Sequence, residues 1–166
     1  MAGFTRHGPM KGEEKHSIPE IVSIEGAKSA ISAGDRIAAD RILGALTGKD
    51  PKDASAWALK GENCLVLSRF EEAKSAFAKA AELEPGNLGT LLGLGKACLK
   101  LKDYNAAIDA YEKAVTADRA GSGAHLKLAS AFIAAGKEKE AIKVLKEAGA
   151  TMPDWGVQQL TLKPEE

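Results

Sequence analysis

Apolar and polar residues follow one another along most of this chain with the spacing of an amphipathic α-helix. In one segment the apolar residues fall three or four positions apart, at Leu91, Leu94, Cys98 and Leu101. After a short polar stretch a second segment has helical spacing again, at Ala107, Ile108, Tyr111, Ala114 and Val115. Because residues at this spacing share one face of a helix, the pattern predicts two consecutive helices, each with one apolar face.

The same pattern returns at a fixed period of 34 residues. An alanine column stands at Ala39, Ala73, Ala107 and Ala141, and four positions later a column of large apolar residues stands at Leu43, Phe77, Tyr111 and Leu145. A second column of small residues consists of Ala27, Gly61, Gly95 and Ala129, and a proline column consists of Pro51, Pro85 and Pro153. A period of a few tens of residues indicates a repeat architecture. Small residues let paired helices approach closely, and large residues fill the remaining gaps.

Residues that cap helix N-termini stand before the helical segments. They are Asp35, Asp53, Asn87 and Asp103. Each offers a side-chain oxygen to the backbone amides of the first helical turn, which have no partner within the helix. Ser17 and Glu20, on either side of Pro19, match a capping box and predict a further helix start.

The unit 54–87 carries residues at the offsets that mark one repeat family. They are Trp57, Gly61, Phe70, Ala73, Phe77, Ala80 and Pro85. This unit resembles the tetratricopeptide repeat, a helix-turn-helix of 34 residues.

The other units resemble the same repeat less completely. In the unit 88–121, Arg119 takes the place of the closing proline, and in the unit 122–155, His125 takes the place of the first aromatic residue. The unit 20–53 is degenerate, because it has small residues at positions that usually hold bulkier ones, namely Ser23 and Gly26. Terminal repeats are commonly atypical.

The resemblance implies an all-α fold, a right-handed superhelical solenoid of antiparallel helix pairs with about four units. In such a solenoid the first helix of each unit lines a concave surface, which is the candidate binding site. A polar leader, residues 1–19, precedes the repeats, and its glycine, proline and charge content predicts disorder. A short tail, residues 156–166, is expected to cap the open face of the last repeat.

By the same resemblance, the second, fifth, ninth, twelfth and thirteenth positions of each first helix line the groove. The fifth positions are Ile24, Ala58, Leu92 and Leu126, and the twelfth are Ile31, Leu65, Leu99 and Ile133. Both columns are apolar, which predicts an apolar groove. The ninth positions are Lys28, Glu62, Lys96 and Ser130. Their charges either bind a partner or pair between neighbouring repeats, and we favour pairing between repeats. Exposed ion pairs contribute only about 0–1 kcal/mol each, so the binding energy would come from the apolar columns.

Three arrangements fit the apolar columns. The groove is open, it is covered by the leader or the tail, or its residues belong partly to the core, since contiguous apolar patches are seldom left bare on monomers. Phe4, Met10 and Ile18 make the leader a candidate occupant. Some family members hold a C-terminal carboxylate with a clamp of lysine and asparagine, but among the matching places here only Lys127 is of a suitable type. An amphipathic helix or an extended apolar segment is therefore the expected ligand.

Charge and composition remove several classes of partner. Lysine plus arginine and aspartate plus glutamate both number 23, so the formal net charge is zero and nothing favours nucleic acid or an acidic membrane surface. No apolar run is long enough to span a bilayer, and the first residues lack the apolar stretch of a signal peptide, so the expected location is the cytoplasm. With 166 residues and 45% hydrophobic content, the chain is expected to fold alone.

No residue pattern predicts catalysis, a metal ion or a cofactor. His7, His16 and His125 offer no pair of ligands on one helix face. Gly93 and Gly95 form a short glycine motif, but it lies inside a helical pattern and not after a strand, so it does not predict a phosphate loop.

The cysteines and tryptophans have structural explanations. Cys64 and Cys98 occupy the same apolar position in adjacent repeats, so we expect buried, inert thiols. Trp57 stands at a packing position of the family and is expected in the core. Trp155 follows the last helix pair and is expected to seal the end of the array.

These features predict a non-enzymatic interaction module or assembly adaptor. It would bind an apolar or amphipathic peptide segment of another protein in its concave groove. The alternative is a self-associating structural protein, a homo-oligomer, whose groove is occupied by its own leader or by another copy. Because tetratricopeptide arrays serve many processes through one architecture, the prediction concerns the kind of partner and not its identity.

Overall fold

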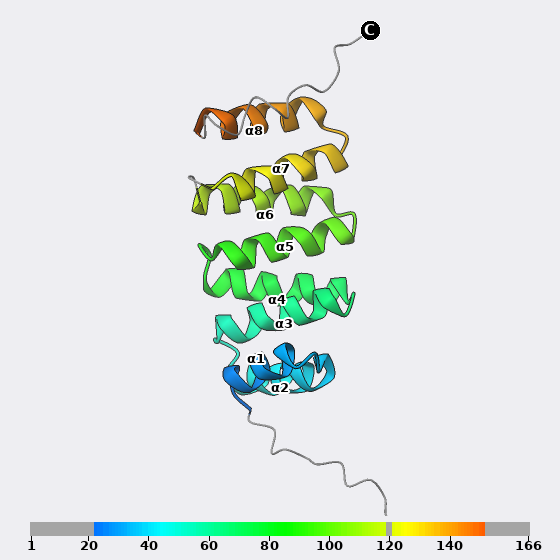
Figure 1. Cartoon of the computed structure of the whole chain (residues 1–166), viewed down its shortest axis with the longest axis vertical. Coiled ribbons are helices and arrows are strands. Elements are labelled where there is room, and N and C mark those ends of the chain that lie inside the picture. The colour runs from blue at the N-terminus through cyan, green and yellow to red at the C-terminus, as the bar shows by residue number, and fades with distance from the viewer. Residues whose placement is uncertain (1–21, 119–120, 152–166) are drawn as a thin grey trace, which may run out of the picture.

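The computed structural model describes residues 22–118 and 121–151, and these residues form eight α-helices and no strand (Figure 1). The helices are α1 (Ile24–Ser32), α2 (Arg36–Lys49), α3 (Ala54–Val66), α4 (Phe70–Leu83), α5 (Leu88–Lys100), α6 (Tyr104–Ala117), α7 (Ser122–Ala134) and α8 (Glu138–Thr151). They stack in chain order along one axis, from α1 and α2 at one end to α8 at the other (Figure 1). The predicted all-α solenoid is confirmed.

The contacts between helices show which side of the stack is concave. Each helix packs against the next along the chain, and in addition α1 contacts α3, α3 contacts α5, and α5 contacts α7. Within the described ranges, no contact joins α2 to α4, α4 to α6 or α6 to α8. The first helices of the repeats therefore form an inner layer and the second helices an outer, more widely spaced layer. A stack of this kind curves toward the inner layer.

The predicted side-chain caps begin four of these helices. The Oδ1 atoms of Asp35, Asp53, Asn87 and Asp103 accept hydrogen bonds from the backbone amides three residues later, at 2.9, 3.0, 3.0 and 3.3 Å. Each bond satisfies a first-turn amide that has no partner within its helix. The starts of α2, α3, α5 and α6 are therefore set by local sequence.

Helix α1 begins later in its repeat than the other first helices. Ser23 is its N-cap, and the Ser23 hydroxyl accepts a hydrogen bond from the Gly26 amide at 3.0 Å. As a result α1 has 9 residues, whereas α3, α5 and α7 have 13 each. The serine that made this repeat look degenerate thus acts as a cap. The predicted capping box of Ser17 and Glu20 lies outside the described residues.

The turn inside each helix pair uses a residue with a left-handed backbone at the same repeat position. These residues are Gly34, Ser68, Lys102 and Gly136, with φ of 79°, 59°, 60° and 73°. Glycine adopts this conformation freely, whereas the Cβ of other residues crowds the following carbonyl. The two middle repeats therefore carry backbone strain that the two terminal repeats avoid.

Replacing Lys102 with glycine is expected to raise the free energy of unfolding by about 0.5–1 kcal/mol, because it removes this strain. The control is Lys113→Gly, a change of the same residue type on the exposed surface of α6. Because Lys113 lies in a helix interior, Lys113→Gly is expected to lower the free energy of unfolding by about 1 kcal/mol. Urea denaturation of both variants measures the two effects. A loss of stability in Lys102→Gly would show that backbone strain is not the controlling factor at this turn.

The residue columns of the sequence meet in the core between the helices. Ala39, Ala73, Ala107 and Ala141 are buried. Phe77 of α4 lies between two glycines, since an ideal Cβ on Gly61 would come within 2.8 Å of its ring and one on Gly93 within 2.4 Å. A Cβ on Gly95 would come within 2.5 Å of the Tyr111 ring. Because Gly61 belongs to α3 and Gly93 to α5, the Phe77 ring joins two successive repeats.

Ion pairs also join successive repeats, each between residues 29 positions apart. Arg69 Nη2 donates to Asp40 Oδ1, and Lys74 Nζ donates to Asp103 Oδ2 at 2.6 Å. Asp40 and Lys74 occupy the same repeat position, as do Arg69 and Asp103. The acidic and basic partners are therefore exchanged between the two ion pairs. The hydrogen bond from Lys74 lowers the pKa of the Asp103 carboxyl below its ordinary value of 3.8. Asp103 therefore stays ionised as the cap of α6.

The prediction that Trp57 belongs to the core is wrong. The Trp57 side chain is half-buried, its Nε1 donates to the Pro51 carbonyl oxygen at 3.0 Å, and Lys60 Nζ lies 5.2 Å from the ring centroid. An indole N–H needs a polar partner, and here that partner lies in the preceding loop, which holds the ring near the surface.

Other predictions fall on residues that the structure does not describe. They concern the leader 1–19, the turn at Arg119, the closing Pro153, the seal at Trp155 and the tail 156–166. In the described ranges, no helix is both long and apolar enough to cross a membrane.

Candidate functional site

Three first helices, α3, α5 and α7, surround a pocket on the inner layer of the solenoid. The pocket has a volume of about 410 Å³ and is lined by Glu62, Leu65, Phe77, Gly89, Leu92, Gly93, Lys96, Leu99, Tyr111, Lys127 and Ser130. Half of the predicted groove residues are among them, namely Glu62, Leu65, Leu92, Lys96, Leu99 and Ser130. The helical repeat thus gathers side chains from three units at one place.

The apolar wall of the pocket consists of Leu65 on α3 and of Leu92 and Leu99 on α5. All three side chains are half-buried. Leu65 packs against the core cluster that contains Phe77, and Leu92 and Leu99 pack against the cluster that contains Tyr111. The leucines therefore belong partly to the core and partly to the pocket surface. Their positions are held by core packing, which makes the apolar wall a preformed feature.

Two glycines of α5 line the pocket, Gly89 and Gly93, which lie one helical turn apart. The rings of Phe77 and Tyr111 line it as well. A Cβ on Gly93 would come within 2.4 Å of Phe77 Cζ, so the ring approaches the α5 backbone closely. These four residues were not among the predicted groove residues. The signal for them was in the sequence, because the glycine motif at Gly93 and Gly95 falls where two aromatic rings must pack.

Charged and polar side chains line the edges of the pocket. Glu62 lies on α3, Lys96 on α5, and Lys127 and Ser130 on α7, and all four side chains are exposed. In the described part of the chain, no ion pair joins Glu62 or Lys96 to another side chain. The expected pairing of ninth-position charges between repeats is therefore not what the structure shows. The pocket thus carries an acidic side chain on α3 and basic side chains on α5 and α7.

The remaining predicted groove residues lie outside this pocket. On α1, Ile31 packs against the core of the first repeat, while Ile24 is half-buried and Lys28 is exposed. Ala58 on α3 is half-buried. On α7, Leu126 and Ile133 are apolar residues with 39% and 58% of their surface exposed. The apolar surface thus continues along α7, but it is not enclosed there.

The side chains that carry reactive chemistry are buried away from the pocket. Cys64 and Cys98 are free thiols with 0% and 1% exposure, and burial raises the pKa of both thiols. Both thiols are therefore protonated at neutral pH, and their burial agrees with the prediction. His125 is also buried, and its Nδ1 forms a hydrogen bond with the Gly121 carbonyl oxygen at 3.1 Å.

The repeat period and the paired helices are those of a known repeat family. Models of the tetratricopeptide repeat match residues 24–87, 65–122 and 99–163. The chain belongs to the tetratricopeptide repeat family. This membership identifies it as a protein-interaction or scaffold module. A search of the curated proteins finds no match to the chain.

Solved tetratricopeptide solenoids superimpose on this one at low sequence identity. A crystal structure of MamA protein has a TM-score of 0.76 at 22% identity and covers 88% of this chain and 81% of that chain. A MamA structure from Desulfovibrio magneticus RS-1 has a TM-score of 0.69 at 22% identity, with coverages of 77% and 72%. A thermophilic tetratricopeptide repeat protein in Thermus thermophilus has a TM-score of 0.60 at 18% identity, with coverages of 76% and 71%. At these identities the likeness shows the fold alone.

Proposed function

We propose that this tetratricopeptide protein binds an apolar or amphipathic peptide segment of a partner protein in the pocket between α3, α5 and α7. The observation that carries the proposal is the leucine wall of Leu65, Leu92 and Leu99, which opens onto a pocket of about 410 Å³. Apolar surface removed from water contributes about 25 cal/mol per Å², so a wall of this kind binds other apolar side chains. Its partial burial in the core also limits the entropy lost on binding.

The edges of the pocket favour an amphipathic ligand over a uniformly apolar one. Glu62 on α3 attracts a basic group, and Lys96 on α5 and Lys127 on α7 attract acidic groups. Exposed charges of this kind orient a ligand and accelerate its association more than they raise its affinity. A helical segment with leucine-like residues on one face and opposite charges toward its two ends meets both requirements.

The proposal is tested with a displayed library of amphipathic helical peptides that have leucine along one face. The peptides are selected on the wild-type chain and then measured against the variant Leu65→Asp, Leu92→Asp, Leu99→Asp. We expect an affinity loss of at least about 100-fold, because each buried leucine contributes about 1.5–3 kcal/mol and each 1.4 kcal/mol is a factor of ten. Ile37→Asp is the control, since Ile37 is an exposed apolar residue of α2 that lies outside the pocket.

Circular dichroism first establishes that both variants keep their helices. Peptides that bind the folded triple variant as well as the wild-type chain would place the binding surface elsewhere. If a second copy of the chain fills the groove instead, light scattering will show a dimer for the wild-type chain and a monomer for the triple variant. That result would replace the peptide ligand with self-association.

A further inference from the structure

Two repeat positions meet at the first two interfaces between units. Asp40 of the first unit accepts a hydrogen bond from Arg69 of the second, and Lys74 of the second unit donates one to Asp103 of the third at 2.6 Å. The position on the second helix of each unit is called here the exit residue, and it holds Asp40, Lys74, Ile108 and Ile142 in the four units. The position directly before the second helix is called the entry residue, and it holds Asp35, Arg69, Asp103 and Lys137.

Arg69 stands at an entry position where the neighbouring units have a helix cap. Asp35 and Asp103 accept hydrogen bonds from the amides three residues later, whereas the Arg69 side chain forms no cap bond with α4. A capping aspartate stabilises the start of a helix, and an arginine does not. The Arg69 and Asp40 side chains are 34% and 30% exposed, so the pair between them adds little to stability. Native stability therefore does not explain the arginine at this position.

The charges match consecutive units and oppose units that lie one place further apart. If the first unit stacked on the third, Asp40 would meet Asp103, and if the second stacked on the fourth, Lys74 would meet Lys137. Both combinations bring like charges together, which is unfavourable. Each of the first two units thus attracts its successor and repels the unit beyond it.

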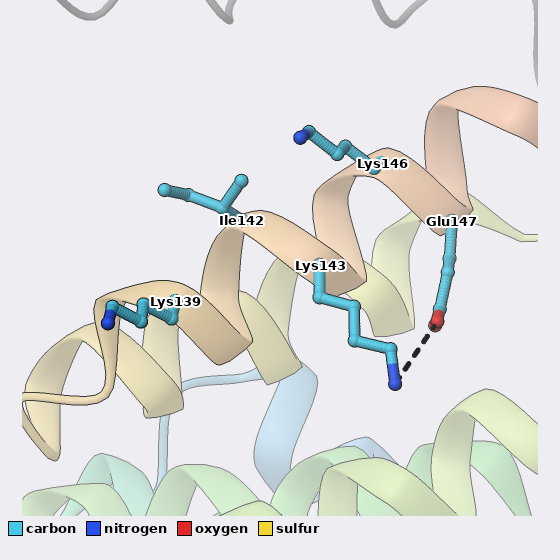
Figure 2. A pocket seen from close by; sticks show the side chains of 5 residues that line it. All are labelled: Lys139, Ile142, Lys143, Lys146 and Glu147. Carbon is cyan, nitrogen blue, oxygen red and sulfur yellow. Dashed lines mark ion pairs between the residues drawn. The ribbon is translucent and has the colours of Figure 1, made fainter.

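The charges are present only where such a choice exists. Among the four described units, only the first and the second have a unit two places further along, and only they carry a charged exit residue. In the third unit the exit residue is Ile108, which is 6% exposed and packs in a core cluster with Leu128. In the fourth it is Ile142, which points away from the preceding repeats, between Lys139 and Lys146 (Figure 2). The exit residue is therefore apolar where no unit has to be rejected.

Core packing between the units favours the same order independently. The Phe77 ring of the second unit lies where a Cβ on Gly93 of the third would come within 2.4 Å, so it fits there only against glycine. In the fourth unit the counterpart of Gly93 is Lys127. In the first unit the counterpart of Phe77 is Leu43, and Leu59 of the second unit packs against the cluster that contains it. A skipped unit would thus set Phe77 against a side chain, or Leu43 against a glycine that leaves a gap.

We propose that the exit and entry residues specify the order in which the repeats stack. Opposite charges guide each of the first two units to its successor, and like charges exclude the next unit but one during folding. Misassembly is a characteristic failure of repeat proteins, because their units offer similar surfaces to one another. The ion pairs act on the choice between alternative stackings more than on the stability of the native one.

Pulsed hydrogen exchange during refolding of the full chain from urea tests this proposal. A molecule that has skipped the second unit has protected amides in α2 and α5 and unprotected amides in α3 and α4. In Asp40→Lys the new charge repels Arg69 and attracts Asp103, so we expect this species to be at least about tenfold more populated than in Arg69→Glu. A factor of ten corresponds to about 1.4 kcal/mol, the change from a repulsive to an attractive exposed pair.

Arg69→Glu is the matched control because it breaks the same ion pair but leaves Asp40 opposed to Asp103. Glutamate is not a preferred cap, so the control adds no bond to the start of α4. Adding Asp103→Asn to Asp40→Lys should return the skipped species to the level of the control. Asparagine keeps the cap of α6, as Asn87 caps α5, but removes the charge that attracts the lysine.

Equilibrium unfolding in urea first establishes that each variant reaches a folded state. If Asp40→Lys does not refold, Asp40→Asn is compared with Arg69→Gln, since both lose the ion pair and only the first loses the repulsion from Asp103. A larger skipped population in Asp40→Asn would then support the proposal. Equal populations in the two variants of either comparison would overturn it, and so would a population in Asp40→Lys that Asp103→Asn leaves unchanged.

Discussion

Replacing Phe77 with alanine is expected to lower the free energy of unfolding by about 3–5 kcal/mol, the usual cost of emptying a buried phenylalanine site. The ring is 1% exposed and contacts the backbones of α3 and α5 at Gly61 and Gly93. The backbones at Gly61 and Gly93 carry no side chain that could move into the vacated space. The cavity should therefore remain open and the cost should be near the upper end.

The same change should also reduce the cooperativity of unfolding. In a repeat array stability depends on the interfaces between neighbouring units, and Phe77 is shared by the second and third units. We expect the urea transition, followed by circular dichroism, to broaden as well as to shift to lower urea. Phe70→Ala is the control on the same helix, because Phe70 is only half-buried. Phe77→Leu should show a smaller loss in the same direction. Equal losses in Phe70→Ala and Phe77→Ala would contradict the role of the ring as a link between repeats.

Replacing Ala107 with leucine is expected to lower the free energy of unfolding by about 1–3 kcal/mol through overpacking. Ala107 on α6 is 0% exposed and lies in the core cluster with Cys98 and Tyr111. The site is at a close approach of two helices, so the extra carbons must push α5 and α6 apart. That movement would also disturb the packing of α7 on α6.

Ala45→Leu is the control for this effect. Ala45 lies on the exposed surface of α2, so the same added volume extends into water. Its effect on stability should stay within about 0.5 kcal/mol. Thermal or urea unfolding compares the two variants directly. A neutral Ala107→Leu variant would show that the alanine column does not set the distance between paired helices.

The sequence alone predicts the helix pairs, because their signals are local and repeated. The caps at Asp53, Asn87 and Asp103 and the periodic alanines lie within a few residues of the elements they define. Each signal also recurs at the same place in several units, which removes the ambiguity of a single occurrence. The family offsets then give the order of inner and outer helices.

The predictions that fail depend on contacts between units or on exceptions to the repeat. Ser23 looked like a departure from the family pattern, although it caps a shortened helix. Trp57 stood at a packing position, but the bond from its indole to Pro51 holds it near the surface. Glu62 and Lys96 have opposite signs at adjacent units, yet the distance between them depends on the stacking geometry, which a residue spacing does not contain.

The pocket itself was predicted only in part, for a related reason. Its leucine wall follows from two columns, the fifth and twelfth positions of the first helices, and could be found by counting positions. Another part of its lining arises where the Phe77 ring takes the place that a Cβ on Gly93 of the next repeat would fill. That combination occurs once in the chain, so no period reveals it.

The most direct test of the proposed binding site is photo-crosslinking of a peptide selected from the amphipathic library. A benzophenone side chain is placed at Ser130, on the pocket edge of α7, or at Glu112, on the exposed surface of the outer helix α6. We expect a crosslink from position 130 that excess unlabelled peptide abolishes, and none from position 112. A competed crosslink from position 112 and none from position 130 would contradict it.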